Sequence, residues 1–522
     1  MAWPSQSQLR AFLAGALIAE ICLIAVIEFA PITLGSPPAP PPPMDPVPTH
    51  IVSALYPISV RSVSAPFDPG NGGAVAVLEG PSLLVTRTGA LYRLEEDEAG
   101  YQALALPPPF ENTVDPSERF AQWVGARDLL IREAGPDTAA LFVSYSHYDP
   151  AEACFEVRLA TTTVARDALE PSSAPSQPAW RILFSTDRCV PMQEGLIAFE
   201  SGGALAALPD GRIAMTVGSL GLGFDGRRRD TALSRKPDTQ FGKVLSIDPM
   251  SGETRILSIG HRNQDGLAVD LAGTLWAVEH GPRGGDELNR IVPGSDFGWP
   301  DASYGTLYGK FVQPADPRVN HSAFEKPVFA WVPSVAPSGM ALARGEMFSL
   351  WEGDLLITTL ASRQLLRVRL EQGRVVLVEP IGLGTRLRDV AVDEDGSLLV
   401  KVDEEPRVLR LRASAEQQQE DAGPLVMCVS CHQLDRGPQQ AGLSGPPLGD
   451  VWQRAVAGYP GYAYSAALAR IDEVWTADNL RNYLNDPAKA VPGTAMPSLA
   501  MQDWEVRAAI RALQRLSKGG RP

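Results

Sequence analysis

Cys428, Cys431 and His432 form a C-x-x-C-H run, the group of residues in this chain with the most specific chemistry. Two thiols three positions apart can each form a thioether bond to one porphyrin, and the adjacent imidazole can then bind its iron. A disulfide or half of a zinc site is the alternative, but a zinc site needs a second ligand pair and none lies nearby in the sequence. The run therefore predicts covalent haem c and a role in electron transfer.

The second iron ligand is predicted at Met496, in a Pro/Gly-rich loop that follows the run. Methionine sulfur opposite histidine raises the reduction potential of haem iron. Met501 is the rival ligand but lacks the Pro-Gly approach, and packing in the core is the alternative role for Met496. Apolar positions at helical spacing predict helices over 473–484 and 504–516 on either side of the loop.

The C-terminal segment from about residue 421 resembles class I c-type cytochromes along its whole length. Besides the C-x-x-C-H run, the resemblance includes Gly-Pro-Pro-Leu at 445–448 and Pro-Gly-Thr-Ala-Met at 492–496. It implies a small all-α domain over 423–522, with the histidine and the methionine named above as the axial ligands of haem c.

The 522 residues are too many for one ordinary domain, and the middle of the chain has a different pattern. Residues 53–412 show short β runs between Asp-Gly, Gly and Pro turns, without a long amphipathic helical pattern. The clearest runs are 213–217, 243–247, 275–278, 355–360, 365–370, 375–378 and 398–402. Many short strands indicate a sandwich, a barrel or a propeller, and recurrent four-strand units favour a propeller.

Three stretches of this segment carry a specific resemblance: Gly-His-Arg-Asn-Gln-Asp-Gly at 260–266, Glu-His-Gly-Pro-Arg-Gly-Gly-Asp-Glu-Leu-Asn at 279–289, and Phe-Gly-Trp-Pro at 297–300. Together they resemble the glucose/sorbosone dehydrogenase family, whose members are six-bladed propellers that use pyrroloquinoline quinone (PQQ) and calcium. The match continues through 331–339 and 386–390. The resemblance implies an all-β six-bladed propeller that oxidises a sugar or a related hydroxyl or aldehyde compound.

The resemblance places Arg262, Asn263, Arg386 and Arg388 at PQQ. PQQ carries three carboxylates, and guanidinium groups bind carboxylates through two parallel hydrogen bonds. Alternate residues of a strand share a face, so Arg386 and Arg388 would act together, and surface salt bridging is the alternative for these arginines. The resemblance also places Glu287, with nearby backbone carbonyls, at a calcium ion, and a solvated acidic turn is the alternative.

The chain departs from the family at the proton acceptor. The family carries a histidine ahead of a Gly-Gly pair, and Glu200 stands at that position here. A carboxylate can act as a general base when its pKa is tuned, and a solvated glutamate is the alternative. The Gly-Asp that often follows the next strand is Gly-Ser at 218–219, and the lysine of some members falls near Ala361. His261 and His280 are expected to be structural.

The amino-terminal region predicts export. Arg10 precedes an apolar run that extends to Phe29, close to the roughly 20 residues needed to cross a bilayer. We expect a transmembrane signal anchor over 1–32 with its amino end inside, and a cleaved signal peptide is the alternative. A Pro-rich linker over 33–52 follows, and a polar linker over 413–422 precedes the haem domain.

Covalent attachment of haem to a C-x-x-C-H run takes place outside the cytoplasm, so the domains are expected in the periplasm. They would be anchored to the inner membrane, or released if the leader is cleaved. In that oxidising compartment Cys154 and Cys189 can form a disulfide, and two separate buried thiols are the alternative. The net charge of -15 argues against a nucleic-acid partner.

Two functions fit this organisation. The first is a periplasmic quinoprotein dehydrogenase in which a sugar-like substrate reduces PQQ and haem c passes the electrons to a respiratory cytochrome or oxidase. The second is a membrane-tethered cytochrome c electron carrier whose non-catalytic propeller serves as a binding or docking module. Glu200, at the position of the family's proton-accepting histidine, is the residue that separates the two.

Overall fold

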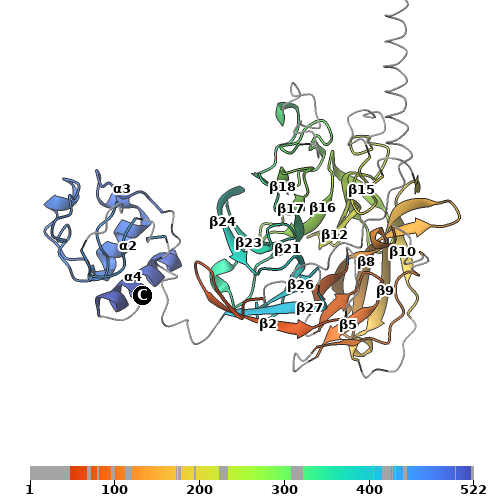
Figure 1. Cartoon of the computed structure of the whole chain (residues 1–522), viewed down its shortest axis with the longest axis horizontal. Helices are drawn as coiled ribbons and strands as arrows, with labels where there is room; N and C mark the ends of the chain where they lie inside the picture. The colour runs from red at the N-terminus through yellow and green to blue at the C-terminus, as the bar shows by residue number, and fades with distance from the viewer. Residues whose placement is uncertain are drawn as a thin grey trace, which may run out of the picture. The chain divides into compact units, whose positions relative to one another are not determined.

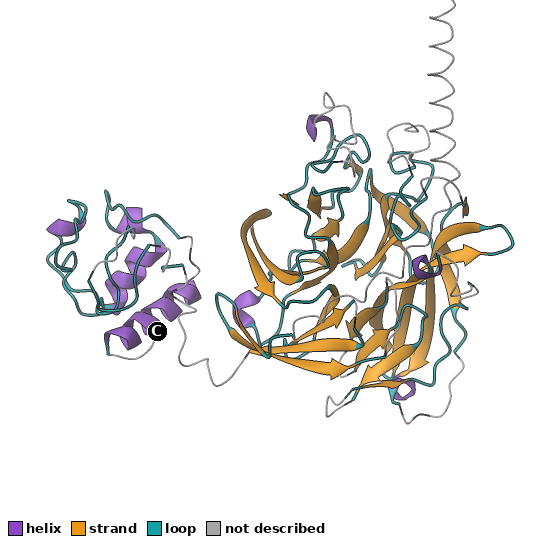
Figure 2. Ribbon diagram, in the orientation of Figure 1, coloured by secondary structure: helices purple, strands orange, loops and turns teal. Residues whose placement is uncertain are grey.

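The computed structural model describes residues 47–518 except for 67–71, 79–80, 96–99, 112–113, 115–119, 172, 174–177, 193–195, 223–232, 307–320, 404, 414–424, 426, 429–430, 439–443, 500 and 502. Figure 1 labels the elements of this part, and Figure 2 separates strands, helices and loops by colour. The described strands lie between His50 and Ala413, and the described α-helices between Ala477 and Ser517.

The strands form six antiparallel sheets, which are the blades of a propeller. Blade 1 contains β3 (Ala74–Val77), β4 (Ser82–Val85), β5 (Leu91–Leu94) and β6 (Tyr101–Ala103). Blade 2 contains β7 (Gly125–Gly135), β8 (Thr138–Asp149), β9 (Cys154–Ala165), β10 (Arg181–Ser185) and β11 (Val190–Pro191). Blade 3 contains β12 (Gly202–Ala207), β13 (Ile213–Val217), β14 (Lys243–Ile247), β15 (Thr254–Ile259) and, parallel to β15, β19 (Ser295–Asp296).

The remaining three blades come from the second half of the propeller. Blade 4 contains β16 (Gln264–Val269), β17 (Leu275–Glu279), β18 (Asp286–Arg290) and β20 (Phe329–Trp331). Blade 5 contains β21 (Pro337–Leu342), β22 (Leu355–Thr359), β23 (Gln364–Glu371) and β24 (Arg374–Gly382). Blade 6 contains β25 (Leu387–Val392), β26 (Leu398–Val402), β27 (Arg407–Ala413), β2 (Pro57–Ser64) and β1 (His50–Val52).

The first strands of successive blades contact one another in a closed ring, in the order β3, β7, β12, β16, β21, β25 and back to β3. The ring closes because β2, from the start of the propeller, pairs with β27, from its end, in a register that runs from Ile58↔Ala413 to Ser64↔Arg407. These contacts confirm the expected six-bladed propeller.

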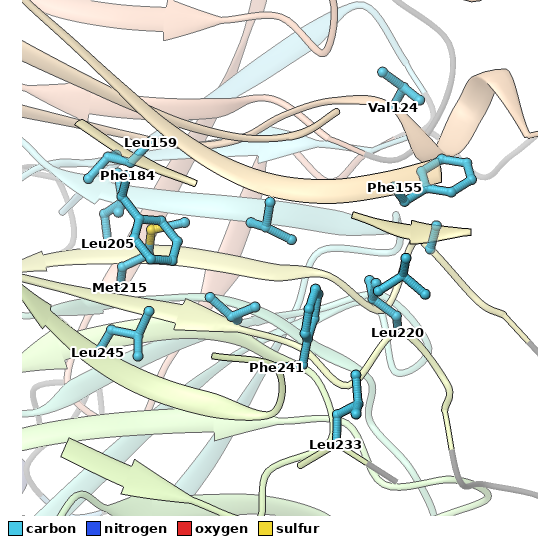
Figure 3. Packing of buried hydrophobic residues seen from close by; sticks show 14 of the residues in the cluster. Val124, Phe155, Leu159, Phe184, Leu205, Met215, Leu220, Leu233, Phe241 and Leu245 are labelled. Atoms are coloured by element: carbon cyan, nitrogen blue, oxygen red, sulfur yellow. The ribbon is translucent and has the colours of Figure 1, made fainter. Parts of the chain in front are cut away.

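Apolar side chains fill the spaces between neighbouring blades. Figure 3 shows Leu159 and Phe184 of blade 2 close to Leu205, Met215 and Leu245 of blade 3, within one buried cluster. Burying a side chain of this size contributes about 1.5–3 kcal/mol. All five residues of β13 and all five of β14 are buried, because a blade with a neighbour on each side has no solvated face.

A disulfide joins Cys154, at the start of β9, to Cys189, just before β11. It joins two residues of blade 2 that are 35 positions apart in the sequence. The expected pairing of these two cysteines is confirmed, and it ties β11 to the strand with which it pairs.

The C-terminal domain contains α2 (Ala477–Asn485), α3 (Pro487–Ala490) and α4 (Asp503–Ser517). The helix expected over 504–516 is confirmed as α4. The helix expected from 473 begins later, because Thr476 caps α2: its Oγ1 accepts from the backbone N–H of Asn479, and Asn479 Oδ1 accepts from Thr476 N at 2.7 Å. Short 3-10 turns lie at Ala121–Trp123, Arg166–Leu169, His321–Ala323, Ser349–Trp351 and Leu468–Arg470.

The anchor expected over 1–32 and most of the Pro-rich linker lie outside the described residues. Within the described part of the chain, no helix combines the length and the apolar character needed to cross a membrane.

Candidate functional site

A cavity of about 1020 Å³ lies where the loops of several blades converge. Residues just before the inner strands β12, β16, β21 and β25 line it, together with loops that join the second and third strands of blades 4 and 5. In an antiparallel blade these two kinds of segment lie at the same end, so the cavity opens at one end of the propeller. The predicted residues Glu200, Arg262, Asn263, Arg386 and Arg388 all line it.

The wall of this cavity is strongly basic. The charged side chains that line it are Arg127, Arg262, Arg283, Arg386, Arg388, Glu200 and Asp265. Five cations against two anions give a formal charge of +3 when histidine is neutral. Guanidinium groups converging on one cavity suit a ligand with several carboxylates.

Arg262 and Glu200 form a buried ion pair in the wall. The Arg262 backbone N–H donates to Glu279 Oε2 at 2.8 Å, and its guanidinium Nη1 donates to the carbonyl oxygen of His280 at 3.2 Å. Burial raises the pKa of Glu200, although the Arg262 charge opposes that rise. Glu200 is only 3% exposed, and its Oε2 has no hydrogen-bond partner within the described residues, so the alternative of a solvated glutamate is wrong.

Asn263, Arg386 and Arg388 are each fixed by a neighbouring group. Asn263 Oδ1 accepts from Gly202 N at 3.0 Å, which ties the start of β16 to the start of β12. Asp403 binds both arginines, with Oδ2 3.3 Å from Arg386 Nη2 and Oδ1 2.7 Å from Arg388 Nε. The two guanidinium groups are therefore held side by side at the edge of the cavity.

Cys428, Cys431 and His432, the predicted haem attachment residues, lie on one turn of the chain. Neither cysteine is in a disulfide, and the backbone N–H groups of Cys431 and His432 both donate to Cys428 O, at 3.1 and 2.8 Å. His432 Nδ1 lies 2.6 Å from the carbonyl oxygen of Pro446. Because a carbonyl only accepts, Nδ1 carries the proton and Nε2 keeps its lone pair for iron.

Gly445 lets this histidine lie against the backbone. A Cβ at position 445 would fall 2.2 Å from His432 Cε1 and 2.6 Å from its Nε2. The His432 ring, whose Nδ1 contacts the carbonyl oxygen of Pro446, can therefore take this position only if residue 445 is glycine.

The sequence model of the family described as Glucose / Sorbosone dehydrogenase matches residues 73–410, which is more than half of the chain. The chain belongs to this family. An uncharacterized protein of Synechocystis is 28% identical over 363 residues, covering 65% of this chain and 82% of that protein. A solved glucose dehydrogenase structure is 25% identical with a TM-score of 0.53, covering 68% of this chain and 99% of that one.

Two curated relatives of the dehydrogenase propeller carry activity names. An aldose sugar dehydrogenase of Escherichia coli is 35% identical over 177 residues, covering 32% of this chain and 47% of that protein. Quinoprotein glucose dehydrogenase B of Acinetobacter calcoaceticus is 25% identical over 303 residues, covering 43% of this chain and 63% of that protein. The chain thus spans about half to two thirds of these two relatives.

A second set of relatives consists of cytochromes, and these match the C-terminal region. Cytochrome c2 of Rhodopila globiformis is 38% identical over 87 residues, covering 17% of this chain and 79% of that protein. Cytochrome c of Sesamum indicum is 34% identical over 85 residues, covering 16% of this chain and 75% of that protein. The C-terminal region therefore belongs to the cytochrome c family, and the chain is a dehydrogenase-family propeller fused to a cytochrome c domain.

Several cavity residues of the propeller are not singled out by the sequence. Arg127 lines the cavity from β7, outside the three stretches that carry the family resemblance. Asp265 and Arg283 fall inside two of the three stretches that carry the family resemblance, and that position is the available signal. His280 also lines the cavity. His261 is fully buried between Ser258 and Glu279 and is structural, as expected.

Glu287 lies in β18 and is not among the residues that line the cavity. It is buried, and burial together with the charge of Glu279 raises its pKa well above the usual range. Asn289 Nδ2 donates to Glu287 Oε2 at 3.2 Å and to Glu279 Oε1 at 2.7 Å. Within the described residues, no group of three or more His, Cys, Asp or Glu side chains is placed to hold a metal ion, so calcium here would need backbone carbonyl ligands.

The backbone of Met496 is held by a hydrogen bond to Thr494. The Met496 N–H donates to Thr494 Oγ1 at 3.3 Å, and that hydroxyl lies 2.5 Å from Tyr483 Oη on α2. Both methionines pack against the core that contains Cys428. Met496 therefore stays the predicted second iron ligand, with Met501 as the alternative.

Replacing Met496 with alanine is expected to keep the covalent haem, lower its reduction potential and open the iron to added ligands, because the sulfur that favours the reduced state is lost. A redox titration and an optical titration with imidazole measure both effects. The control is Met501→Ala, which should change neither quantity. If the two variants exchange these outcomes, Met501 is the ligand.

Proposed function

We propose that this protein is a periplasmic quinoprotein dehydrogenase that oxidises a sugar or a related hydroxyl or aldehyde compound. Electrons pass through haem c to a respiratory cytochrome or oxidase. One observation carries the proposal. The same chain contains a dehydrogenase-family cavity with a formal charge of +3 and a C-x-x-C-H turn. Two redox centres on one chain avoid a diffusional encounter between separate proteins. The names of the aldose sugar dehydrogenase and quinoprotein relatives support this substrate and cofactor class.

The cavity residues fit PQQ by their chemistry. Arg262, Arg386 and Arg388 would bind its carboxylates, and Asn263 would contribute hydrogen bonds from the same wall. When bound, PQQ supplies a quinone that takes two electrons from the substrate. Ala361, near the position of the lysine found in some members, lines the cavity without a charge, so the arginines would carry the electrostatic part of binding.

The chain's own residues would position the substrate and remove its hydroxyl proton. Glu200 occupies the position of the family's proton-accepting histidine and is the first candidate for that role. Glu287, with neighbouring carbonyls, would hold calcium, whose charge would offset the burial that now raises the pKa of this carboxyl group. The N-terminal region would anchor the protein to the inner membrane, or direct its release into the periplasm if cleaved.

A second candidate function is a tethered cytochrome c carrier with a non-catalytic propeller that acts as a binding or docking module. The observation that favours it is the Glu200–Arg262 ion pair, which occupies both the candidate base and a predicted cofactor residue. Under this alternative the ion pair is permanent and the cavity does not take up PQQ.

The two functions are separated by adding PQQ, calcium and then D-glucose or other aldoses to the purified full-length protein. The haem absorbance is followed at each addition. Sugar-dependent reduction of the haem that requires PQQ is the result expected for the dehydrogenase. Absence of measurable PQQ binding by calorimetry would eliminate the dehydrogenase and leave the carrier.

A further inference from the structure

His280 lies in the wall of the cavity directly beside Asp265. We infer that His280, held by Asp265, accepts the proton of the substrate hydroxyl in place of Glu200. The inference rests on the proposed function. In the family this proton goes to a histidine, and Glu200 stands at the corresponding position here. Glu200 and His280 are therefore competing candidates for one role, and the contacts of each decide between them.

Two paired strands bring His280 and Asp265 together. Asp265 is in β16 and His280 directly follows β17, in a register that pairs Gln264 with Glu279. The His280 backbone N–H donates to Asn263 O at 2.9 Å, and the His280 ring Nε2 lies 3.3 Å from Asp265 Oδ2. Asn263 Nδ2 donates to the same carboxylate oxygen at 3.0 Å. The carboxylate is thus fixed in place and can orient the ring, so Asp265 is a positioning residue.

The imidazole is more accessible than the Glu200 carboxylate. The side chain of His280 is 19% exposed and that of Glu200 is 4% exposed. The buried ring nitrogen Nε2 faces Asp265 Oδ2 at 3.3 Å and has no hydrogen-bond partner among the described residues. This orientation leaves Nδ1 as the ring nitrogen for the substrate. Glu200 would have to give up its buried ion pair with Arg262 before it could bind a substrate hydroxyl, and this adds a desolvation cost that His280 does not carry.

In the proposed step the proton moves from the substrate hydroxyl to the His280 ring. The O–H bond of the substrate hydroxyl breaks and an N–H bond forms at Nδ1 of neutral His280. PQQ, when bound, would supply the oxidant that takes the hydrogen on the same carbon with its electron pair, so that the carbon–oxygen bond would become a carbonyl. The imidazolium that results lies beside the Asp265 carboxylate, which stabilises its charge.

The charged groups facing His280 set the pH dependence of this step. Burial lowers the pKa of His280, but the contact with Asp265 and the charges of Asp265 and Asp286 outweigh it, and Arg262 opposes them, so the pKa lies above its ordinary value. Glu200 also interacts with the imidazole charge. Because the acceptor must be neutral, turnover should rise with pH through this pKa, and Asp265→Asn should move the rise to lower pH.

The first test compares His280→Gln, Asp265→Asn and Glu200→Gln in full-length protein loaded with PQQ and calcium. We expect His280→Gln to lose at least about 100-fold in sugar-dependent haem reduction, the usual scale of general base catalysis. PQQ affinity by calorimetry and thermal unfolding should stay close to wild type. Glu200→Gln should lose less than tenfold. His147→Gln, in blade 2 and outside the cavity, is the matched control and should behave as wild type.

The second test reads the ring itself, without turnover. Full-length protein that carries an isotope label on a ring carbon of its six histidines is titrated by NMR. The histidine resonance that is missing from the spectrum of His280→Gln is assigned to residue 280. We expect a pKa above about 6.5 that falls in Asp265→Asn. Full turnover in His280→Gln, or an unshifted ring pKa in Asp265→Asn, overturns this inference alone. Failure of sugar to reduce haem in the loaded wild type overturns the proposed function together with the inference.

Discussion

Replacing both Cys428 and Cys431 with alanine is expected to remove all covalently attached haem. The two thiols lie on one turn with His432 and neither is in a disulfide, whereas Cys154 and Cys189 are joined to each other. A haem-stained denaturing gel measures the result, because only thioether-bound haem stays with the unfolded chain. The stain should disappear from the full-length band, and sugar-dependent absorbance changes at the haem should disappear with it.

The control for this variant is the pair Cys154→Ala and Cys189→Ala, which removes the disulfide of blade 2 and leaves the haem turn intact. That double variant should keep its haem stain even if its propeller is less stable, since removing a native disulfide typically costs about 2–5 kcal/mol. A stained band from the Cys428/Cys431 variant would refute haem attachment at this turn.

Replacing Arg262 with alanine is expected to give the largest loss of PQQ affinity. Its guanidinium lines the cavity and is the predicted partner of a PQQ carboxylate. A hydrogen bond to a charged group contributes about 1.5–3 kcal/mol, and each 1.4 kcal/mol corresponds to about tenfold in the dissociation constant. Calorimetry of wild type and variant with PQQ and calcium should therefore show at least a tenfold difference for each bond lost.

The Arg262→Ala variant also leaves Glu200 buried without its cation, which by itself would destabilise the propeller. The double variant Arg262→Ala with Glu200→Gln removes that unpaired charge and isolates the effect on the cofactor. Arg255→Ala, at an exposed arginine in β15, is the control for general loss of positive charge. Equal PQQ affinity in wild type and in the double variant would exclude Arg262 from the cofactor site.

The individual strands were largely predictable, because local signals bracket them. The expected runs 213–217, 243–247 and 398–402 agree with β13, β14 and β26 residue for residue. Each is a short apolar run next to a turn with glycine, aspartate or proline, and both kinds of signal are local. The expected start of α2 at 473 was wrong because the run of apolar residues continues ahead of its capping threonine.

The pairings between distant residues were not predictable in the same way. Arg262 and Glu200 come from different blades, 62 residues apart, and periodicity carries no information about such a contact. His280 and Asp265 sit in two recognisable stretches, yet their contact depends on the register between β16 and β17. The buried ion pair and the histidine–carboxylate pair thus became visible only in the structure, whereas Arg262, Arg386 and Arg388 followed from the family resemblance.

The pairing of β2 with β27 also determines when the propeller can fold. Ser59 Oγ donates to Arg412 O across a sequence separation of 353 residues, so the last blade cannot form until nearly all of the propeller has been synthesised. Contacts this far apart in sequence form slowly, and until they form, β2 has an unpaired edge open to other chains. The cytochrome c domain is made last, after β27. A chain interrupted before residue 407 would therefore lack both the haem turn and the strand that completes blade 6, and we expect it to aggregate rather than accumulate as a smaller dehydrogenase.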